Sequence, residues 1–173
     1  MSIKGKRVVI LIEADYQDLE VHYPRLRLLE AGMEVILAGT GSAKRYVGKY
    51  GYPVDVDCNV QDIDAGSIDG VVIPGGWAPE RLRMSEAVLK LVQNMASAGK
   101  VVASICHGGW VLASAGVARG KRITSYIAIK DDLKNAGAAW VDVEVCIDGN
   151  LITARKPDDL PAFVRAVIDV LEK

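Results

Sequence analysis

The 173-residue chain has few cysteines, few histidines and no excess of positive charge. Its three cysteines form no CxxC pair, which argues against a disulfide framework and is typical of a reducing compartment. With only two histidines and no close Cys/His cluster, we expect no metal site. The formal net charge is −1, so nothing in the composition favours binding to nucleic acid or to anionic lipid.

Long hydrophobic runs and targeting segments are also lacking. The N-terminal residues are charged and lead directly into a short apolar run, without a small-residue cleavage site. No stretch of 18 apolar residues occurs that could cross a membrane. We therefore expect a cytoplasmic protein that folds as one domain over residues 1–173, a length that buries a large core without disulfides.

Strand and helix patterns alternate along the chain. Runs rich in β-branched residues occur at 7–12, 34–38, 69–74 and 100–105, and helical patterns occur at 18–31, 85–98, 109–115 and 157–173. Strands that are apolar on both faces are typical of a parallel sheet covered on both sides, so we predict a doubly wound α/β sandwich. Residues 39–57 predict a small antiparallel hairpin added to this sheet, and the Asp148-Gly149 turn predicts another between residues 141–147 and 151–154.

Cys106 is the candidate nucleophile. It follows a predicted buried strand and precedes a predicted helix, so the thiol is expected at a helix N-terminus, where the dipole and unpaired N–H groups favour a thiolate. Small residues two positions either side, Ser104 and Gly108, match the spacing of a nucleophile elbow. The next residue, His107, is a candidate base.

Three further features support a site at Cys106. Gly75 and Gly76 end the third predicted parallel strand, and their N–H groups, with that of His107, are candidate donors to an oxyanion. Glu20 lies just beyond the first strand, at the same edge of the sheet. Glu80 follows the glycine pair closely and is the second candidate acid.

Each candidate also has a structural alternative. A lone cysteine is most often a small core residue, and this interpretation is the one we assign to Cys58 and Cys146. For His107 the alternative is a helix cap, since a neighbour in sequence need not face the thiol. Glu20 and Glu80 have the alternative of solvated acids at helix starts, where the helix dipole favours them.

Five ordered motifs resemble those of the DJ-1/PfpI superfamily, and most closely its PfpI-like branch. They are DLExxYP at 18–24, GKYG at 48–51, PGGxAPER at 74–81, ASICHG at 103–108 and TSYxxIKDD at 124–132. The resemblance covers nearly the whole chain. It implies a flavodoxin-like sandwich and a reactive elbow cysteine at Cys106, hydrogen-bonded to Glu20.

The resemblance also implies a homo-oligomer, a dimer or larger. The third member of a Cys-His-acid triad would come from a neighbouring subunit, so that Cys106 and His107 of one chain meet Glu80 of another. One departure is notable, because relatives usually carry proline after His-Gly where this chain has Gly109-Trp110, which alters the floor of the pocket.

Three functions use the same thiol. The first is a cofactor-free glyoxalase or deglycase, in which Cys106 attacks a small aldehyde and Glu20 or His107 moves the proton. The second is an intracellular cysteine peptidase with a Cys106-His107-Glu80 triad completed in trans. The third is a redox sensor or stress chaperone, in which Glu20 stabilises an oxidised Cys106. A glutamine amidotransferase is excluded, because no histidine follows His107.

Overall fold

A seven-stranded sheet in the order β10-β11-β7-β6-β1-β2-β5 forms the centre of the computed structural model, which describes residues 3–173. Its strands are β1 (Arg7–Ile12), β2 (Glu34–Gly39), β5 (Cys58–Asn59), β6 (Gly70–Ile73), β7 (Val101–Ile105), β10 (Val145–Asp148) and β11 (Leu151–Ala154). Every neighbouring pair is parallel except β10 and β11. The predicted doubly wound, flavodoxin-like sheet is confirmed.

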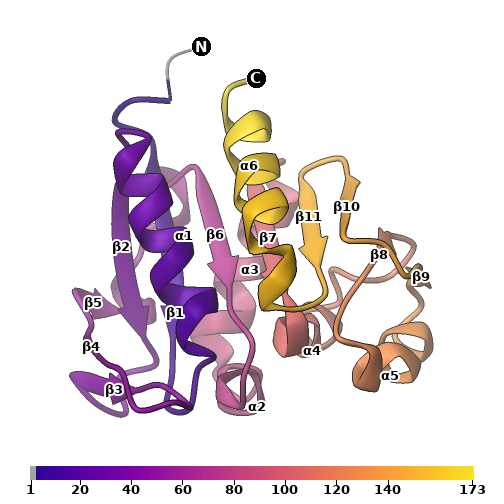
Figure 1. The fold of residues 1–173 in the computed structure, drawn as a ribbon, viewed down its shortest axis with the longest axis horizontal. Helices are drawn as coiled ribbons and strands as arrows, with labels where there is room; N and C mark the ends of the chain where they lie inside the picture. The colour runs from indigo at the N-terminus through magenta and orange to yellow at the C-terminus, as the bar shows by residue number, and fades with distance from the viewer. Residues whose placement is uncertain (1–2) are drawn as a thin grey trace.

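Helices cover both faces of this sheet. They are α1 (Asp18–Glu30), α2 (Ala78–Leu82), α3 (Glu86–Ser97), α4 (Gly109–Ser114), α5 (Lys130–Asn135) and α6 (Leu160–Leu171). Figure 1 shows α1 and α6 in contact on the near face, while α3 lies behind the sheet. Within residues 3–173, no helix is both long enough and apolar enough to cross a membrane.

The core lies between the sheet and the two helical layers. Every residue of β6 and β7 is buried, as expected for valine and isoleucine runs covered on both sides. α6 turns one apolar stripe to the sheet, with Phe163, Val167 and Leu171 buried. Each such side chain contributes roughly 1.5–3 kcal/mol when it leaves water, so these contacts hold the helices in place.

The helix boundaries follow local signals that the sequence contains. The Ser85 hydroxyl accepts a hydrogen bond from Val88 N at the start of α3, which is the role of an N-cap serine. Gly32 follows α1 with φ +88°, a left-handed conformation that ends a helix at little cost only for glycine. At the C-terminus, the predicted helix over 157–173 begins as the 3₁₀ turn Pro157–Asp159 and becomes α-helical at Leu160.

The two predicted hairpins differ in how they join the sheet. β10 and β11 pair antiparallel at its edge, with the first strand beginning at Val145. In contrast, β3 (Arg45–Val47) and β4 (Pro53–Asp55) form a separate two-stranded sheet, so the expected extension of the main sheet by this hairpin is wrong. The physical reason is that β5 occupies the free edge of β2, and the hairpin instead bonds to the loop after β1 through Asp15 N to Val47 O at 2.9 Å.

The structure also contains short strands that the sequence did not predict. β8 (Arg122–Ile123) and β9 (Ala139–Trp140) pair as a second small sheet. Two residues are too few to give a periodic pattern, so the sequence did not predict them.

The parallel strands end at one edge of the sheet, the lower edge in Figure 1. Strand order reverses between β1 and β6, because the chain adds β2 on one side of β1 and then β6 on the other. Ligands of doubly wound sheets bind at such a point. The residues that follow β1, β6 and β7 meet there.

Candidate active site

Cys106 occupies a sharp turn between β7 and α4. Its φ is +61°, a left-handed conformation that costs a non-glycine residue roughly 1–3 kcal/mol and that persists mainly at functional sites. The turn needs glycine two residues later, because a Cβ at Gly108 would lie 2.6 Å from Ile73 O and 2.7 Å from the Ser104 hydroxyl. The elbow spacing in the sequence therefore corresponds to a real steric requirement.

Glu20 lies beside this thiol in the first turn of α1. Its side chain is fully buried, and Oε2 accepts a hydrogen bond from the Gly75 N–H at 2.7 Å. Within residues 3–173, the other oxygen, Oε1, is buried without a hydrogen-bond partner. Gly75 makes this approach possible, since a Cβ there would lie 2.6 Å from Oε2 and 3.0 Å from the Cys106 sulfur.

Burial changes the acidity of both groups. It raises the pKa of Glu20 to about 7, although the Gly75 hydrogen bond acts in the opposite direction. Burial, and next to it the charge of Glu20, raise the pKa of the Cys106 thiol to about 12. The sequence predicted that N–H groups at the turn favour a thiolate. The N–H groups of His107 and Gly76 do lower the pKa of the Cys106 thiol. Burial and the charge of Glu20 raise it by more, so the net shift is upward.

The thiol and the carboxyl therefore titrate as a pair. When the pair holds one proton, that proton is either on sulfur, beside a carboxylate, or on Glu20, beside a thiolate. The second form is the nucleophilic one, and in it the carboxylic acid faces the sulfur as a hydrogen-bond donor. A neutral Glu20 is thus the condition under which Cys106 can be charged.

Of the three expected oxyanion donors, two point to the sulfur. The N–H groups of Gly76 and His107 both interact with the Cys106 sulfur. The Gly75 N–H is already engaged by Glu20, so in this structure it holds the acid in place. Gly76 has φ +76° and packs directly against the chain after β1, where a Cβ would lie 2.4 Å from Gln17 N.

His107 faces the thiol but meets no acid within residues 3–173. Its Nδ1 lies 3.3 Å from the Cys106 sulfur, the one hydrogen-bond contact of the ring in this part of the chain. Aromatic rings surround it, with centroids 4.8 Å away in Tyr126, 5.2 Å in Trp110 and 6.0 Å in Trp77. Burial and the charge of Lys49 lower the pKa of His107, so the ring is neutral at pH 7.

Glu80 does not join this group within one chain. It lies on the short helix α2, is exposed, and is absent from the lining of the cavity at Cys106. The structure thus brings together Cys106, His107, Glu20 and the two glycines, and leaves Glu80 on the surface.

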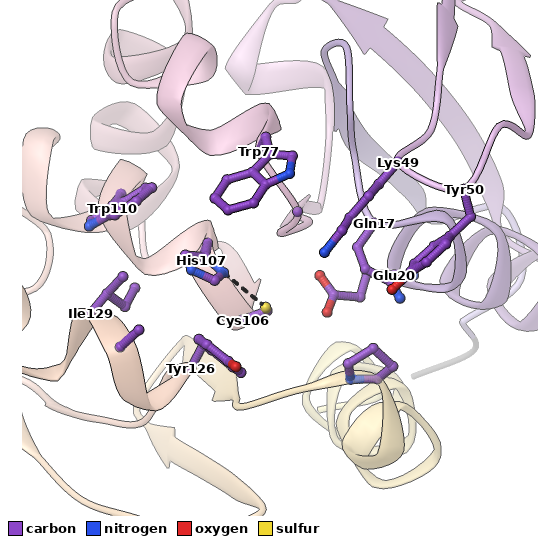
Figure 2. Close-up of a pocket in the computed structure, with 13 residues that line it drawn as sticks. Gln17, Glu20, Lys49, Tyr50, Trp77, Cys106, His107, Trp110, Tyr126 and Ile129 are labelled. Carbon is purple, nitrogen blue, oxygen red and sulfur yellow. Dashed lines mark hydrogen bonds between the residues drawn. The ribbon is translucent and has the colours of Figure 1, made fainter.

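These residues open into a cavity of about 460 Å³, a size suited to a small molecule. Figure 2 shows Lys49, Gln17 and Tyr50 on one side of the cavity and Trp110, Tyr126 and Ile129 on the other.

Sequence reasoning about single residues missed most of this lining. Lys49 and Tyr126 lie within motifs quoted for the family resemblance, GKYG and TSYxxIKDD, which was the available signal. Trp110 follows Gly109, which stands where relatives usually carry proline. It lines the cavity and donates its indole N–H to Asp132 at 2.7 Å.

Known proteins are similar to this chain over nearly its whole length. A model of the DJ-1/PfpI family matches residues 6–170. A protein of Pyrococcus abyssi named a deglycase is 48% identical over 168 residues, which are 96% of this chain and 99% of that protein. A Bacillus subtilis protein, YraA, whose name assigns it provisionally to the cysteine proteases, is 36% identical over 168 residues, 97% of this chain and 99% of YraA.

A solved structure shows the same fold. The crystal structure of Drosophila melanogaster DJ-1beta superimposes with a TM-score of 0.91 at 30% sequence identity. The match covers 96% of this chain and 90% of that one.

Proposed function

Because the chain belongs to the DJ-1/PfpI family, we propose that it is a glyoxalase or deglycase, an enzyme that converts small α-oxoaldehydes through the Cys106 thiolate without a cofactor. The deglycase name of the Pyrococcus abyssi relative supports this choice. So does the cavity, whose volume suits a small carbonyl compound.

The reaction on an α-oxoaldehyde has three steps. The Cys106 thiolate forms a bond to the aldehyde carbon, C1, and the oxygen takes the proton from Glu20, which gives a hemithioacetal. Glu20, now a carboxylate, removes the proton from C1 and returns it to C2, while the hydroxyl proton moves from the oxygen on C1 to the oxygen on C2, which leaves a thioester of a 2-hydroxy acid. Water then cleaves the thioester, which releases the hydroxy acid and restores the thiol. The substrate is oxidised at C1 and reduced at C2, so no external oxidant is required.

The position of Glu20 carries this proposal. A proton shuttle needs an acid beside the nucleophile with a pKa near the working pH, and the pKa of Glu20 is about 7. Its Oε1 has no other partner among the described residues and is free to exchange a proton with the substrate. Backbone N–H groups of Gly76 and His107 supply the electrostatic stabilisation that a developing oxyanion needs.

A cysteine peptidase is the second candidate, and the Cys106–His107 contact at 3.3 Å is the observation that favours it. A peptidase needs His107 as a base with an acid to orient it. Within the chain the ring has aromatic neighbours instead, so this function requires an oligomer in which Glu80 of a neighbouring subunit reaches His107.

Side-by-side assays of methylglyoxal and a fluorogenic peptide distinguish the candidates. We expect wild type to convert methylglyoxal to lactate, with little peptide cleavage, and Cys106→Ala to lose the activity. Metal-chelated, Tris-free buffer and heat-inactivated protein are the controls, because trace metal and amines also consume methylglyoxal. Peptide cleavage without lactate formation would favour the peptidase. If neither substrate reacts while Cys106 oxidises selectively, the redox function is the better one.

A further inference from the structure

We propose that Lys49 makes the cavity selective for α-oxoaldehydes whose far end carries a carboxylate or another anionic group. This inference rests on the proposed function and adds the class of substrate. The observation that carries it is a lysine ammonium group that lines the cavity and forms no ion pair with any carboxylate in the described part of the chain.

Lys49 is the one positively charged lining residue when the pair at Cys106 is ready to react. In that state Glu20 holds the proton, and His107 is neutral because burial and Lys49 lower the pKa of its ring. Apart from the Cys106 thiolate, the other lining side chains are amide, aromatic or aliphatic. The Lys49 ammonium group balances the single negative charge of the Cys106–Glu20 pair but makes no ion pair of its own, so it can attract the anionic end of a ligand, which a neutral ligand lacks.

The loop that carries Lys49 is fixed in place. The Lys49 N–H donates to Tyr16 O at 2.8 Å, and the two oxygens of Asp18 accept from Tyr50 N at 2.9 Å and Tyr52 N at 3.0 Å. Gly48 allows this close approach, because a Cβ there would lie 2.5 Å from an Asp18 oxygen. A charge held on an ordered loop loses less entropy on binding a ligand than one on a mobile loop.

The side chain itself lies over aromatic rings at the cavity. Its Nζ is 5.4 Å from the ring centroid of Trp77 and 5.5 Å from that of Tyr50, within the range of cation–π attraction. Figure 2 shows Lys49 and Gln17 on the same side as Glu20. Gln17 uses Oε1 to cap Glu20 N at 3.0 Å, so its amide NH₂ is a second donor for the same anionic group.

A matched pair of substrates tests this selectivity. The acid is 4,5-dioxopentanoate, which has the reacting α-oxoaldehyde at one end and a carboxylate at the other, and the neutral control is its methyl ester. The step is the one proposed above: the acid takes up water and yields 2-hydroxyglutarate. A hydrogen bond between charged groups corresponds to a preference of about 10- to 100-fold, so we expect kcat/KM of wild type to favour the acid by that factor.

Variants then assign the preference to Lys49. Lys49→Met should lower the ratio of kcat/KM for acid over ester towards one, and Lys49→Arg, which keeps the charge, should retain most of it. Lys44→Met is the matched control, because Lys44 is an exposed lysine five positions earlier in the sequence and does not line the cavity. The ratio is the readout because any effect of Lys49 on Glu20 changes both substrates alike. Added salt should lower the ratio in wild type.

The outcomes separate the inference from the function on which it rests. If wild type converts acid and ester equally well, or if Lys44→Met lowers the ratio as much as Lys49→Met, the inference is wrong and the proposed function stands. If wild type converts neither compound nor methylglyoxal, the proposed function fails and the inference fails with it.

Discussion

Replacement of Glu20 by glutamine should lower activity and at the same time stabilise the protein in a pH-dependent way. The pKa of Glu20 is about 7 in the folded protein and 4.5 as an ordinary carboxyl. At a pH between 4.5 and about 7, Glu20 keeps its proton in the folded state and has lost it in the unfolded chain. The contribution of Glu20 to stability is therefore fully present below pH 4.5 and is lost as the pH rises through about 7.

The expected magnitude follows from this difference. Each pKa unit corresponds to 1.36 kcal/mol, so a difference of about 2.5 amounts to about 3 kcal/mol. Glutamine has nearly the same shape, can accept the Gly75 hydrogen bond and does not titrate. The free energy of unfolding of Glu20→Gln, relative to wild type, should thus rise by about 3 kcal/mol between pH 4.5 and pH 8. Its kcat/KM on methylglyoxal should fall by roughly 10²-fold or more, the usual scale for loss of a general acid.

Urea unfolding at fixed protein concentration over this pH range measures the effect. Repeating the comparison in a Cys106→Ala background removes the coupling to the thiol. Glu86→Gln is the matched control, since Glu86 is exposed at the start of α3 and its carboxyl is in water in both states. A stability difference between wild type and Glu20→Gln that stays constant from pH 4.5 to 8 would refute the raised pKa and, with it, the assignment of Glu20 as the proton shuttle.

Three further outcomes are expected. Iodoacetamide at neutral pH should modify Cys106 first, because only this thiol lies in the cavity beside a buried carboxylate, Glu20, that can take its proton. Peptide mass spectrometry that finds the first adduct on either of the other cysteines would contradict this. Gly108→Ala should destabilise the fold by more than about 2 kcal/mol in urea unfolding, since its Cβ would meet a backbone carbonyl at 2.6 Å; an unchanged midpoint would disprove the steric argument. Glu80→Gln should keep methylglyoxal turnover within about tenfold of wild type, while it reduces any peptide cleavage much further. If the variant sediments like wild type and loses both activities equally, one triad serves both reactions.

Local chemistry in the sequence determined the fold class and the nucleophile. Valine and isoleucine runs that are apolar on both faces require cover on both sides, and this predicted the parallel sheet and its helical layers. The elbow was readable because its requirements are local: small residues at positions 104 and 108 around Cys106. The helix ends at Ser85 and Gly32 were readable for the same reason.

Tertiary structure decided how the candidate groups meet. Glu20 and Glu80 had equal standing as sequence candidates, yet one is buried against the thiol and the other is exposed on α2. No local pattern separates them, because burial depends on which loops the sheet brings together at its carboxyl edge. The same holds for Lys49, which reaches the cavity only because the hairpin bonds to the chain after β1 and not to the free edge of β2. The acidity of the thiol also depends on this assembly, since desolvation and a carboxyl 86 positions away in the sequence outweigh the turn on which Cys106 sits.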